Sequence, residues 1–215
     1  MLTFQSGSDV NNLKLEAYAS QAKRWPKTGR HILAQFDSES VFVYQAYRPE
    51  IGRFAAEHGY FGGAFSLGRM SWIKPNFLWM MYRSGWASKE GQEVVLAVRL
   101  KRAAFDEILS RAVHSSYVPD LYDSREAWSA AVARSDVRLQ WDPDHGPKGQ
   151  ALERRAIQLG LRGATLAKYA RDWILGVKDV TPFVREQAGK VADLLTPREE
   201  PYAVADPDVA RRLGL

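Results

Sequence analysis

The apolar positions along the chain predict short strands with helices placed irregularly between them. Runs rich in β-branched and aromatic residues are typical of strands and occur at 31–36, 41–47, 70–73, 93–100, 136–141 and 153–161. Capped or amphipathic stretches are typical of helices and occur at 13–23, 48–58, 75–84, 101–112, 163–176 and 181–195, with a short helix beginning at 124. Because no regular alternation of strand and helix is kept, the pattern favours a single α+β domain with a mixed, mostly antiparallel sheet and several flanking helices.

Residues 69–86 combine strong apolar character with positive charge. The segment holds Trp72, Trp79 and Trp86 together with three cations, and it has no acidic residue. Pro75 predicts the start of a helix that is apolar nearly all round and therefore buried. A buried cation needs a partner, so these cations pair either with protein carboxylates or with an anionic ligand such as a phosphate.

The length of 215 residues suits one domain with appendages. The polar beginning and the Pro- and charge-rich end predict an N-terminal arm over 1–30, one domain over 31–195 and a flexible C-terminal tail over 196–215. No secretory leader is visible, and the most apolar run is too short to span a membrane. The absence of cysteine excludes disulfides, thiolate catalysis and cysteine-bound zinc, and it fits a cytoplasmic protein.

The net charge of +5 is concentrated in one part of the chain. Residues 69–102 contain seven Lys or Arg and two Glu, a surplus of five that equals the whole net charge. Such a block favours a phosphate, nucleotide or nucleic-acid partner, and the alternative is an ordinary solvated basic face. The glycine-rich phosphate-binding motifs of P-loop and Rossmann proteins are absent, and the four histidines lack metal-ligand spacing, so no metal site is expected.

The end of the second predicted strand carries Gln45, Tyr47 and Arg48. An amide, a phenol and a guanidinium at one strand end are suited to a phosphate or ribose site, since Arg can clamp a diphosphate with two parallel hydrogen bonds. The alternative is that Arg48 pairs at the surface with Glu50 or Glu57.

The stretch before the central helix carries Arg69, Ser71, Trp72 and Lys74. In an extended backbone Trp72 and Lys74 share one face, where the indole can stack on a planar ring while the amine meets a phosphate. The helix N-terminus that follows also favours anions. The alternative is a core tryptophan beside a lysine whose stem is buried and whose amine reaches solvent. Arg83 and Trp86 lie at the far end of that helix, roughly 15 Å away, and are the weaker candidates for touching the same ligand.

Gln158 lies in the middle of an otherwise apolar predicted strand. A buried glutamine needs partners for its amide. Its role is either a structural hydrogen bond between strands or a place in a site together with Gln140 and Asp142. Asp142 itself either faces a ligand or caps the turn that Pro143 begins.

Three segments taken together resemble the domain-of-unknown-function family 4291. They are VYQAYRPEIGRFAAEHG (43–59), GRMSWIKPNFLWMMYRSGWASKEGQEVVLAVRL (68–100) and the stretches VRLQWDPDHG, LERRAIQLGL and YARDWILGVKDVT within 137–181. The resemblance covers about residues 32–195. It implies a fold similar to that of the ADP-ribosyltransferases, which bind NAD in a crevice of a split mixed sheet.

That resemblance implies a role for each group of candidates. The basic residue of the first core strand is Arg48, or Gln45 with Tyr47 beside it; the aromatic or hydroxyl position is Ser71 with Trp72; and the third position is Gln158. Gln158 departs from the acidic residue of such sites, because an amide cannot act as a carboxylate. Either Asp142 or Glu153 supplies the acid, or the chain is not a transferase.

The leading hypothesis is therefore an ADP-ribosyltransferase-like enzyme that takes NAD as its substrate and needs no metal. Arg48, Arg69 and Lys74 are expected to hold the diphosphate, Trp72 or Tyr47 to stack on a base, and Gln158 with Arg48 to take part in catalysis. The basic surplus favours an RNA or DNA acceptor. The alternative is a non-catalytic nucleic-acid-binding module that stacks bases on exposed tryptophans, and a third is an interaction protein whose cations are all paired within the fold.

Overall fold

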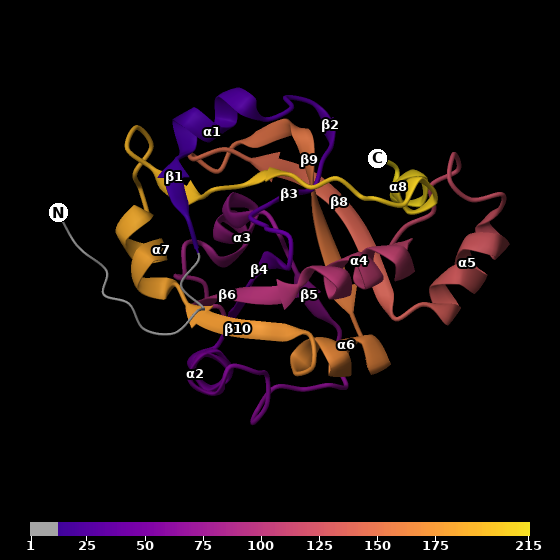
Figure 1. The fold of residues 1–215 in the computed structure, drawn as a ribbon, viewed down its shortest axis with the longest axis horizontal. Helices are drawn as coiled ribbons and strands as arrows, with labels where there is room; N and C mark the ends of the chain where they lie inside the picture. Colours follow the sequence, from indigo (N-terminus) through magenta and orange to yellow (C-terminus); the bar gives the residue numbers. More distant parts are fainter. Residues whose placement is uncertain (1–12) are drawn as a thin grey trace.

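The computed structural model describes residues 13–215, in which two β-sheets form the centre of the molecule (Figure 1). The first sheet has the order β10–β6–β4 and consists of β4 (Ser40–Tyr47), β6 (Val94–Lys101) and β10 (Ile174–Asp179). The second has the order β2–β9–β8–β7, with β5 also on β9, and consists of β2 (Gly29–Arg30), β5 (Ser71–Ile73), β7 (Ala112–His114), β8 (Val137–His145) and β9 (Ala151–Leu161). In these two sheets only the β2–β9 and β7–β8 pairs are parallel. The predicted α+β class with a mixed, mostly antiparallel arrangement is confirmed.

The two sheets meet at a single pair of residues. The Tyr44 N–H of β4 donates to the Lys74 carbonyl at 2.7 Å, and the Lys74 N–H donates back at 3.2 Å. Lys74 follows β5 directly, so this bridge joins the edge of the first sheet to the edge of the second. Past this isolated bridge, β4 and β5 do not pair with each other as neighbouring strands of a sheet, which leaves space between the ends of the two strands.

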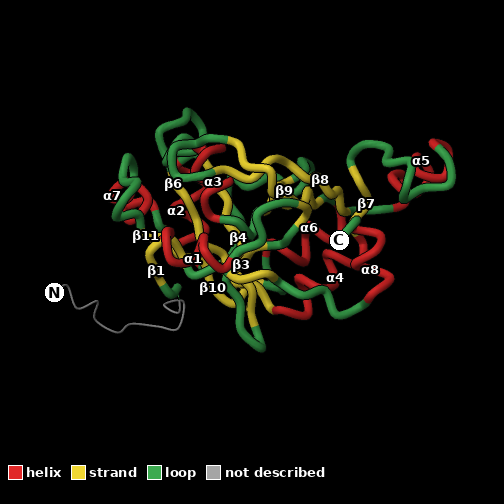
Figure 2. Tube along the Cα trace, turned by 90° about the horizontal axis from the view of Figure 1, so that it is seen from above, coloured by secondary structure: helices red, strands yellow, loops and turns green. Residues whose placement is uncertain are grey.

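Helices surround the sheets (Figures 1 and 2). They are α1 (Tyr18–Arg24), α2 (Pro49–His58), α3 (Phe77–Ser84), α4 (Arg102–Arg111), α5 (Arg125–Arg134), α6 (Gly163–Ala170), α7 (Thr181–Gln187) and α8 (Pro207–Leu213). Both views place α5 at the periphery, and it is the one helix of residues 13–215 with no buried residue. None of these helices is long and apolar enough to cross a bilayer.

The central helix α3 is buried, as its apolar sequence predicts. The side chains of Phe77, Met80 and Met81 are at most 2% exposed and pack on Phe42 and Tyr44 of β4. The opposite face of β4 belongs to a second, larger core cluster. The first sheet is therefore covered on both faces, which explains why its strands lack a polar alternation.

The predicted helix over 163–176 is wrong in its second half. The helix α6 ends at Ala170, and the chain then forms the strand β10, which pairs antiparallel with β6. The edge of β6 presents unpaired backbone groups that need a partner, and the residues of β10 supply one. Tertiary pairing thus outweighs the local helical pattern.

Two predicted boundaries also move. The helix predicted over 181–195 ends at Gln187, two residues before Gly189, whose φ of +79° is incompatible with a continuing helix. The strand predicted over 136–141 continues to His145, with a break in register near Pro143, where a residue without an N–H is tolerated.

The segment 196–215, for which the sequence predicts a flexible tail, is packed on the body. β11 (Leu195–Pro197) pairs with β1 (Leu15–Ala17), and β12 (Glu200–Pro201) pairs with β3 (Leu33–Ala34). The helix α8 then buries Val209 and Leu213. Apolar side chains spaced among the prolines and charges hold this segment in place. Residues 13–30 of the predicted arm likewise form β1, α1 and β2, whereas residues 1–12 lie outside the described part of the chain.

The docking of α8 has a direct test. Leu213 is fully buried, so Leu213→Ala is expected to lower the free energy of unfolding by about 2–5 kcal/mol. Leu215, two residues further on, is 44% exposed, and Leu215→Ala serves as the matched control with little effect. Urea unfolding measures both. Equal, small effects of the two substitutions would indicate that α8 is not docked and that the segment 196–215 is the flexible tail that the sequence predicts.

Candidate functional site

A cleft of about 780 Å³ lies where the ends of β4 and β5 separate. Its walls come from the end of β4, the loop before β5, β5 itself, α3, the loop before β6, and the facing residues of β8 and β9. The structure brings every predicted site residue into this one cleft: Gln45, Tyr47, Arg48, Arg69, Ser71, Trp72, Lys74 and Gln158.

A hydrogen-bond network ties the two sheets together at the cleft. The Gln45 amide donates to Tyr47 OH at 2.7 Å and to Ser71 Oγ at 2.8 Å, and Tyr169 OH donates to Gln45 Oε1 at 2.5 Å. Tyr47 OH and Ser71 Oγ are themselves 2.6 Å apart. One of their two hydroxyl hydrogens lies between these oxygens, so the other is free to donate to a ligand. Tyr169, on α6, was not among the predicted residues, because nothing in its local sequence distinguishes it from a core tyrosine.

The ring of Tyr47 is held by the aromatic loop that follows α2. Phe61 and Phe65 meet it edge-on, with centroids 5.6 and 5.9 Å away. Burial raises the pKa of Tyr47, whereas the hydrogen bonds with Ser71 and Gln45 act in the opposite direction. This phenol is therefore a neutral donor or acceptor, and its packing favours Trp72 as the ring that stacks on a ligand.

Trp72 lies across a glycine of the neighbouring strand. It is the register partner of Gly160 in β9, and a Cβ atom at Gly160 would stand 3.0 Å from two atoms of the indole. Contacts that short are outside the normal range, so the glycine allows the ring to lie against the sheet. The indole is half-buried in the cleft wall.

Among residues 13–215, four basic side chains and no carboxylate line the cleft. Arg48, Arg69 and Arg83 are exposed, whereas Lys74 is buried. Arg48 also forms the surface pair with Glu50 that the sequence leaves open, at 3.1 Å between two largely exposed side chains. Such a pair is weak and does not prevent Arg48 from turning to a ligand. Arg83, the weaker candidate because of its distance along the helix, also lines the cleft, because the cleft extends along α3 and includes its last turn.

Lys74 is only 5% exposed, and within residues 13–215 no carboxylate lies in ion-pair contact with it. Its Nζ stands 5.2 Å from the ring centre of Trp79 and donates a long bond of 3.4 Å to the Trp72 carbonyl. Burial lowers the pKa of Lys74 to about 7, with a further lowering by Arg83 that Asp142 partly opposes.

Gln158 belongs to a small polar cluster on the face of β8 and β9 that lines the cleft. Its Nε2 donates to one oxygen of Asp142 at 2.6 Å, and the Nε2 of Gln140 donates to the other at 3.0 Å. Burial raises the pKa of Asp142, while the two amides lower it. Of the two acids considered from the sequence, Asp142 is therefore the one in contact with Gln158, whereas Glu153 is exposed elsewhere on β9. The cluster also shows that Gln158 has a structural bond as well as a place in the cleft.

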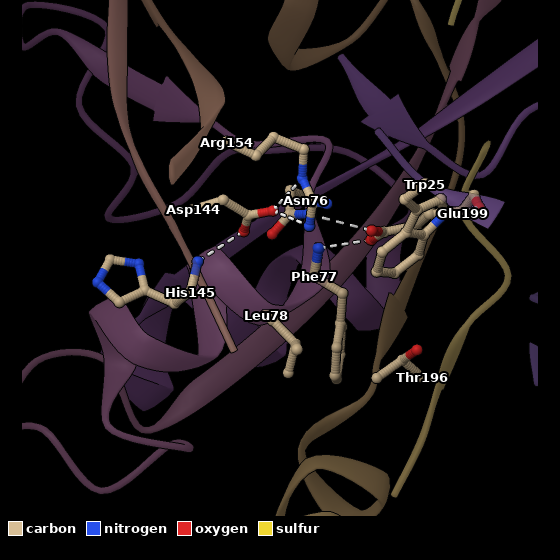
Figure 3. Close-up of a pocket in the computed structure, with 9 residues that line it drawn as sticks. All are labelled: Trp25, Asn76, Phe77, Leu78, Asp144, His145, Arg154, Thr196 and Glu199. Atoms are coloured by element: carbon tan, nitrogen blue, oxygen red, sulfur yellow. Dashed lines mark hydrogen bonds and ion pairs between the residues drawn. The ribbon is translucent and has the colours of Figure 1, made fainter. Parts of the chain in front are cut away.

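A buried network fixes the beginning of α3 (Figure 3). The Arg154 guanidinium donates to Asp144 at 2.5 and 2.8 Å, and its Nη1 donates to the Pro26 carbonyl at 2.7 Å. Glu199 accepts from the Phe77 N–H at 2.6 Å and from the Asn76 amide at 3.2 Å. Burial raises the pKa of Glu199 well above its usual range. Strands far apart in the sequence thereby hold the turn between Lys74 and α3.

The tryptophans of residues 69–86 are not arranged as an open stacking platform. Trp79 is buried, Trp72 lies against Gly160, and Trp86 packs edge-on against Phe77 with centroids 6.4 Å apart. Nucleic-acid modules that stack bases need exposed aromatic faces. This geometry favours a crevice for a small ligand over a base-stacking surface.

Residues 13–215 contain no group of three or more His, Cys, Asp or Glu side chains arranged to hold a metal ion.

The family described as "Domain of unknown function (DUF4291)" matches residues 31–202, which is most of the chain. No curated protein matched.

Proposed function

The chain belongs to the DUF4291 family, and we propose that it is an ADP-ribosyltransferase-like enzyme that binds NAD in the cleft and transfers ADP-ribose to a nucleic-acid acceptor. The observation that carries this proposal is the lining of the cleft, to which the described part of the chain contributes four basic side chains and no carboxylate, at the place where two sheets separate.

The charge of the cleft supports an anionic ligand. Exposed guanidinium groups from three separate elements, Arg48, Arg69 and Arg83, surround the opening. Guanidinium groups bind phosphate oxygens in pairs, and a diphosphate presents several such oxygens. Because no acidic residue among those described lines the cleft, these guanidinium groups are available to an anionic ligand there.

The size and shape of the cleft support a dinucleotide. A volume of about 780 Å³ falls within the usual range of small-molecule sites, roughly 300–1,000 Å³. Trp72 provides one flat wall for a base. Of the two hydroxyl hydrogens of Tyr47 and Ser71, the one that does not lie between their oxygens is a donor for a polar edge of that base.

The Gln158 cluster supplies groups for the ribose of the nicotinamide half. Because Gln158 donates its amide to Asp142, its carbonyl oxygen is oriented away from that bond and can accept from a ribose hydroxyl. In the proposed reaction the bond between C1′ of the ribose and the nicotinamide nitrogen breaks, and neutral nicotinamide leaves with the bonding pair. The resulting oxocarbenium ion is then captured by the acceptor. Asp142, which accepts the hydrogen bond from Gln158, adds negative charge that stabilises this cation.

An assay with NAD labelled in the adenosine half tests the proposal. The wild-type protein is incubated with RNA and DNA oligonucleotides, and nicotinamide release and label transfer are both measured. Arg48→Ala and Gln158→Ala are expected to reduce both by at least about tenfold, because each removes a contact to the ligand. Arg134→Ala, an exposed arginine of α5 outside the cleft, is the control. Equal activity of all three variants would contradict the assignment of the cleft as the site.

A further inference from the structure

Transfer to a neutral acceptor requires a group that takes up the acceptor's proton. Gln158 cannot do so, because an amide is not a base. Asp142 is poorly placed, because both of its oxygens already accept hydrogen bonds from Gln140 and Gln158 and it is not among the residues that line the cleft. The proposed reaction therefore lacks a proton acceptor among the residues so far assigned to it.

Lys74 is another titratable residue that lines the cleft, and it is only 5% exposed. Its Nζ makes one long hydrogen bond and no ion pair within residues 13–215. A buried ammonium without a carboxylate partner is unfavourable, and its neutral form carries a lone pair that a nearby proton donor can reach.

The position of this amine is fixed by the fold. The backbone of Lys74 forms the bridge to Tyr44, and Pro75 follows it. Asn76 caps α3 by accepting from the Trp79 N–H at 2.8 Å, and Glu199 binds the same turn. A residue held from both sides in this way can present a reactive group with little reorganisation.

We infer that Lys74 is the general base that takes the proton from the acceptor, and that the acceptor group is therefore an O–H or N–H of a nucleic acid. This inference rests on the proposed function. After nicotinamide has departed with the bonding pair, the acceptor atom bonds to C1′ of the oxocarbenium ion and its proton passes to Lys74 Nζ, which becomes an ammonium. A carboxylate acceptor has no proton to lose and would need no base.

The charges around Lys74 set the pH dependence. Arg83 of α3 faces it and favours the neutral amine, Asp142 of β8 opposes this, and Arg48 and Arg69 complete the cationic lining. With a pKa of about 7, lower than that of an ordinary lysine because of burial, the amine is protonated and inactive below pH 7 and neutral above it. The transfer rate, measured as kcat/KM, is expected to rise with pH through about 7 and then to level off.

Lys74→Met and Lys74→Arg test the inference. Methionine fills a similar volume without a base, and arginine stays protonated. At pH 8 both variants are expected to lose transfer to an oligonucleotide by about 10²–10⁴-fold. They are also expected to bind NAD within about tenfold of the wild type, since the lysine is mostly neutral there. Lys89→Met, an exposed lysine beyond α3 and outside the cleft, should retain the wild-type rate and pH profile.

The possible outcomes distinguish the role of Lys74 from the proposed function on which it rests. Wild-type transfer rates in both Lys74 variants, or an unchanged pH profile, would overturn the role of Lys74 and leave the proposed function standing. Transfer only to carboxylate groups would overturn the assignment of the acceptor. A wild-type protein that neither binds nor cleaves NAD would refute the proposed function itself. Lys74→Met should melt at or above the wild-type temperature, because it removes a buried amine, and this confirms that lost activity is not lost folding.

Discussion

Arg154→Met is expected to lower the free energy of unfolding by about 3–5 kcal/mol, because it leaves Asp144 buried without its counter-charge. Both side chains are almost fully buried, and the guanidinium also binds the Pro26 carbonyl. The ring of Trp25 packs against the same guanidinium at 5.2 Å. Removing the arginine thus breaks its contacts with Trp25 and Pro26. It also leaves the Asp144 carboxylate buried without its ion-pair partner.

Urea unfolding followed by circular dichroism measures this effect. Lys190→Met is the matched control, since it removes a cation from the surface pair with Glu186 and should change stability by less than about 1 kcal/mol. The double substitution Arg154→Met with Asp144→Leu should recover much of the loss, because no buried charge remains. A loss below about 1 kcal/mol for Arg154→Met would show that Asp144 is not buried in solution.

Replacing Arg69 and Arg83 together by alanine is expected to weaken the binding of ADP-ribose by about 100-fold or more. Each substitution removes a charge-assisted hydrogen bond to a phosphate, worth at least about 1.5 kcal/mol, and 1.4 kcal/mol corresponds to a tenfold change. The two arginines come from the loop before β5 and from the last turn of α3, so they approach a ligand from two sides of the cleft. Isothermal titration calorimetry at fixed salt measures the dissociation constant.

The control for this pair keeps the net charge equal. Arg134→Ala with Arg185→Ala removes two exposed arginines that do not line the cleft, and it should leave ADP-ribose binding unchanged. If both double variants weakened binding to the same extent, the effect would come from the overall charge and not from the cleft. The binding of NAD and of ADP-ribose should respond in parallel, because the diphosphate is common to both.

Local sequence patterns were sufficient for elements that carry their own signals. Proline and glycine at the two ends of α2 mark boundaries that need no tertiary information. β10 and the docked segment after Leu195 were missed because their structure depends on partners far away in the sequence. The pairing of β10 with β6 and of β11 with β1 supplies hydrogen bonds that no local pattern reveals.

For the site too, some residues could be identified from the local sequence and others only from the fold. Gln45, Tyr47 and Ser71 were found because polar residues at strand ends are conspicuous in an apolar context, and the structure joins them in one network. Arg83 was set aside on its distance along α3, although the cleft follows that helix. Glu199 lies in the segment predicted as a tail, so its contact with the first residue of α3 required the fold. The sequence left open whether Asp142 or Glu153 is the acid that acts with Gln158. The register of β8 on β9 brings Asp142 into hydrogen-bond contact with Gln158.

The most direct test of the central claim is a calorimetric titration of the wild-type protein with NAD, at low and at physiological salt, alongside the same titration with an oligonucleotide. The cleft as described predicts saturable binding of one NAD per chain with a dissociation constant below the millimolar range, which Arg69→Ala with Arg83→Ala weakens. Absence of NAD binding at millimolar concentration, together with oligonucleotide binding that weakens steeply with salt, would contradict the claim and identify a nucleic-acid-binding module instead.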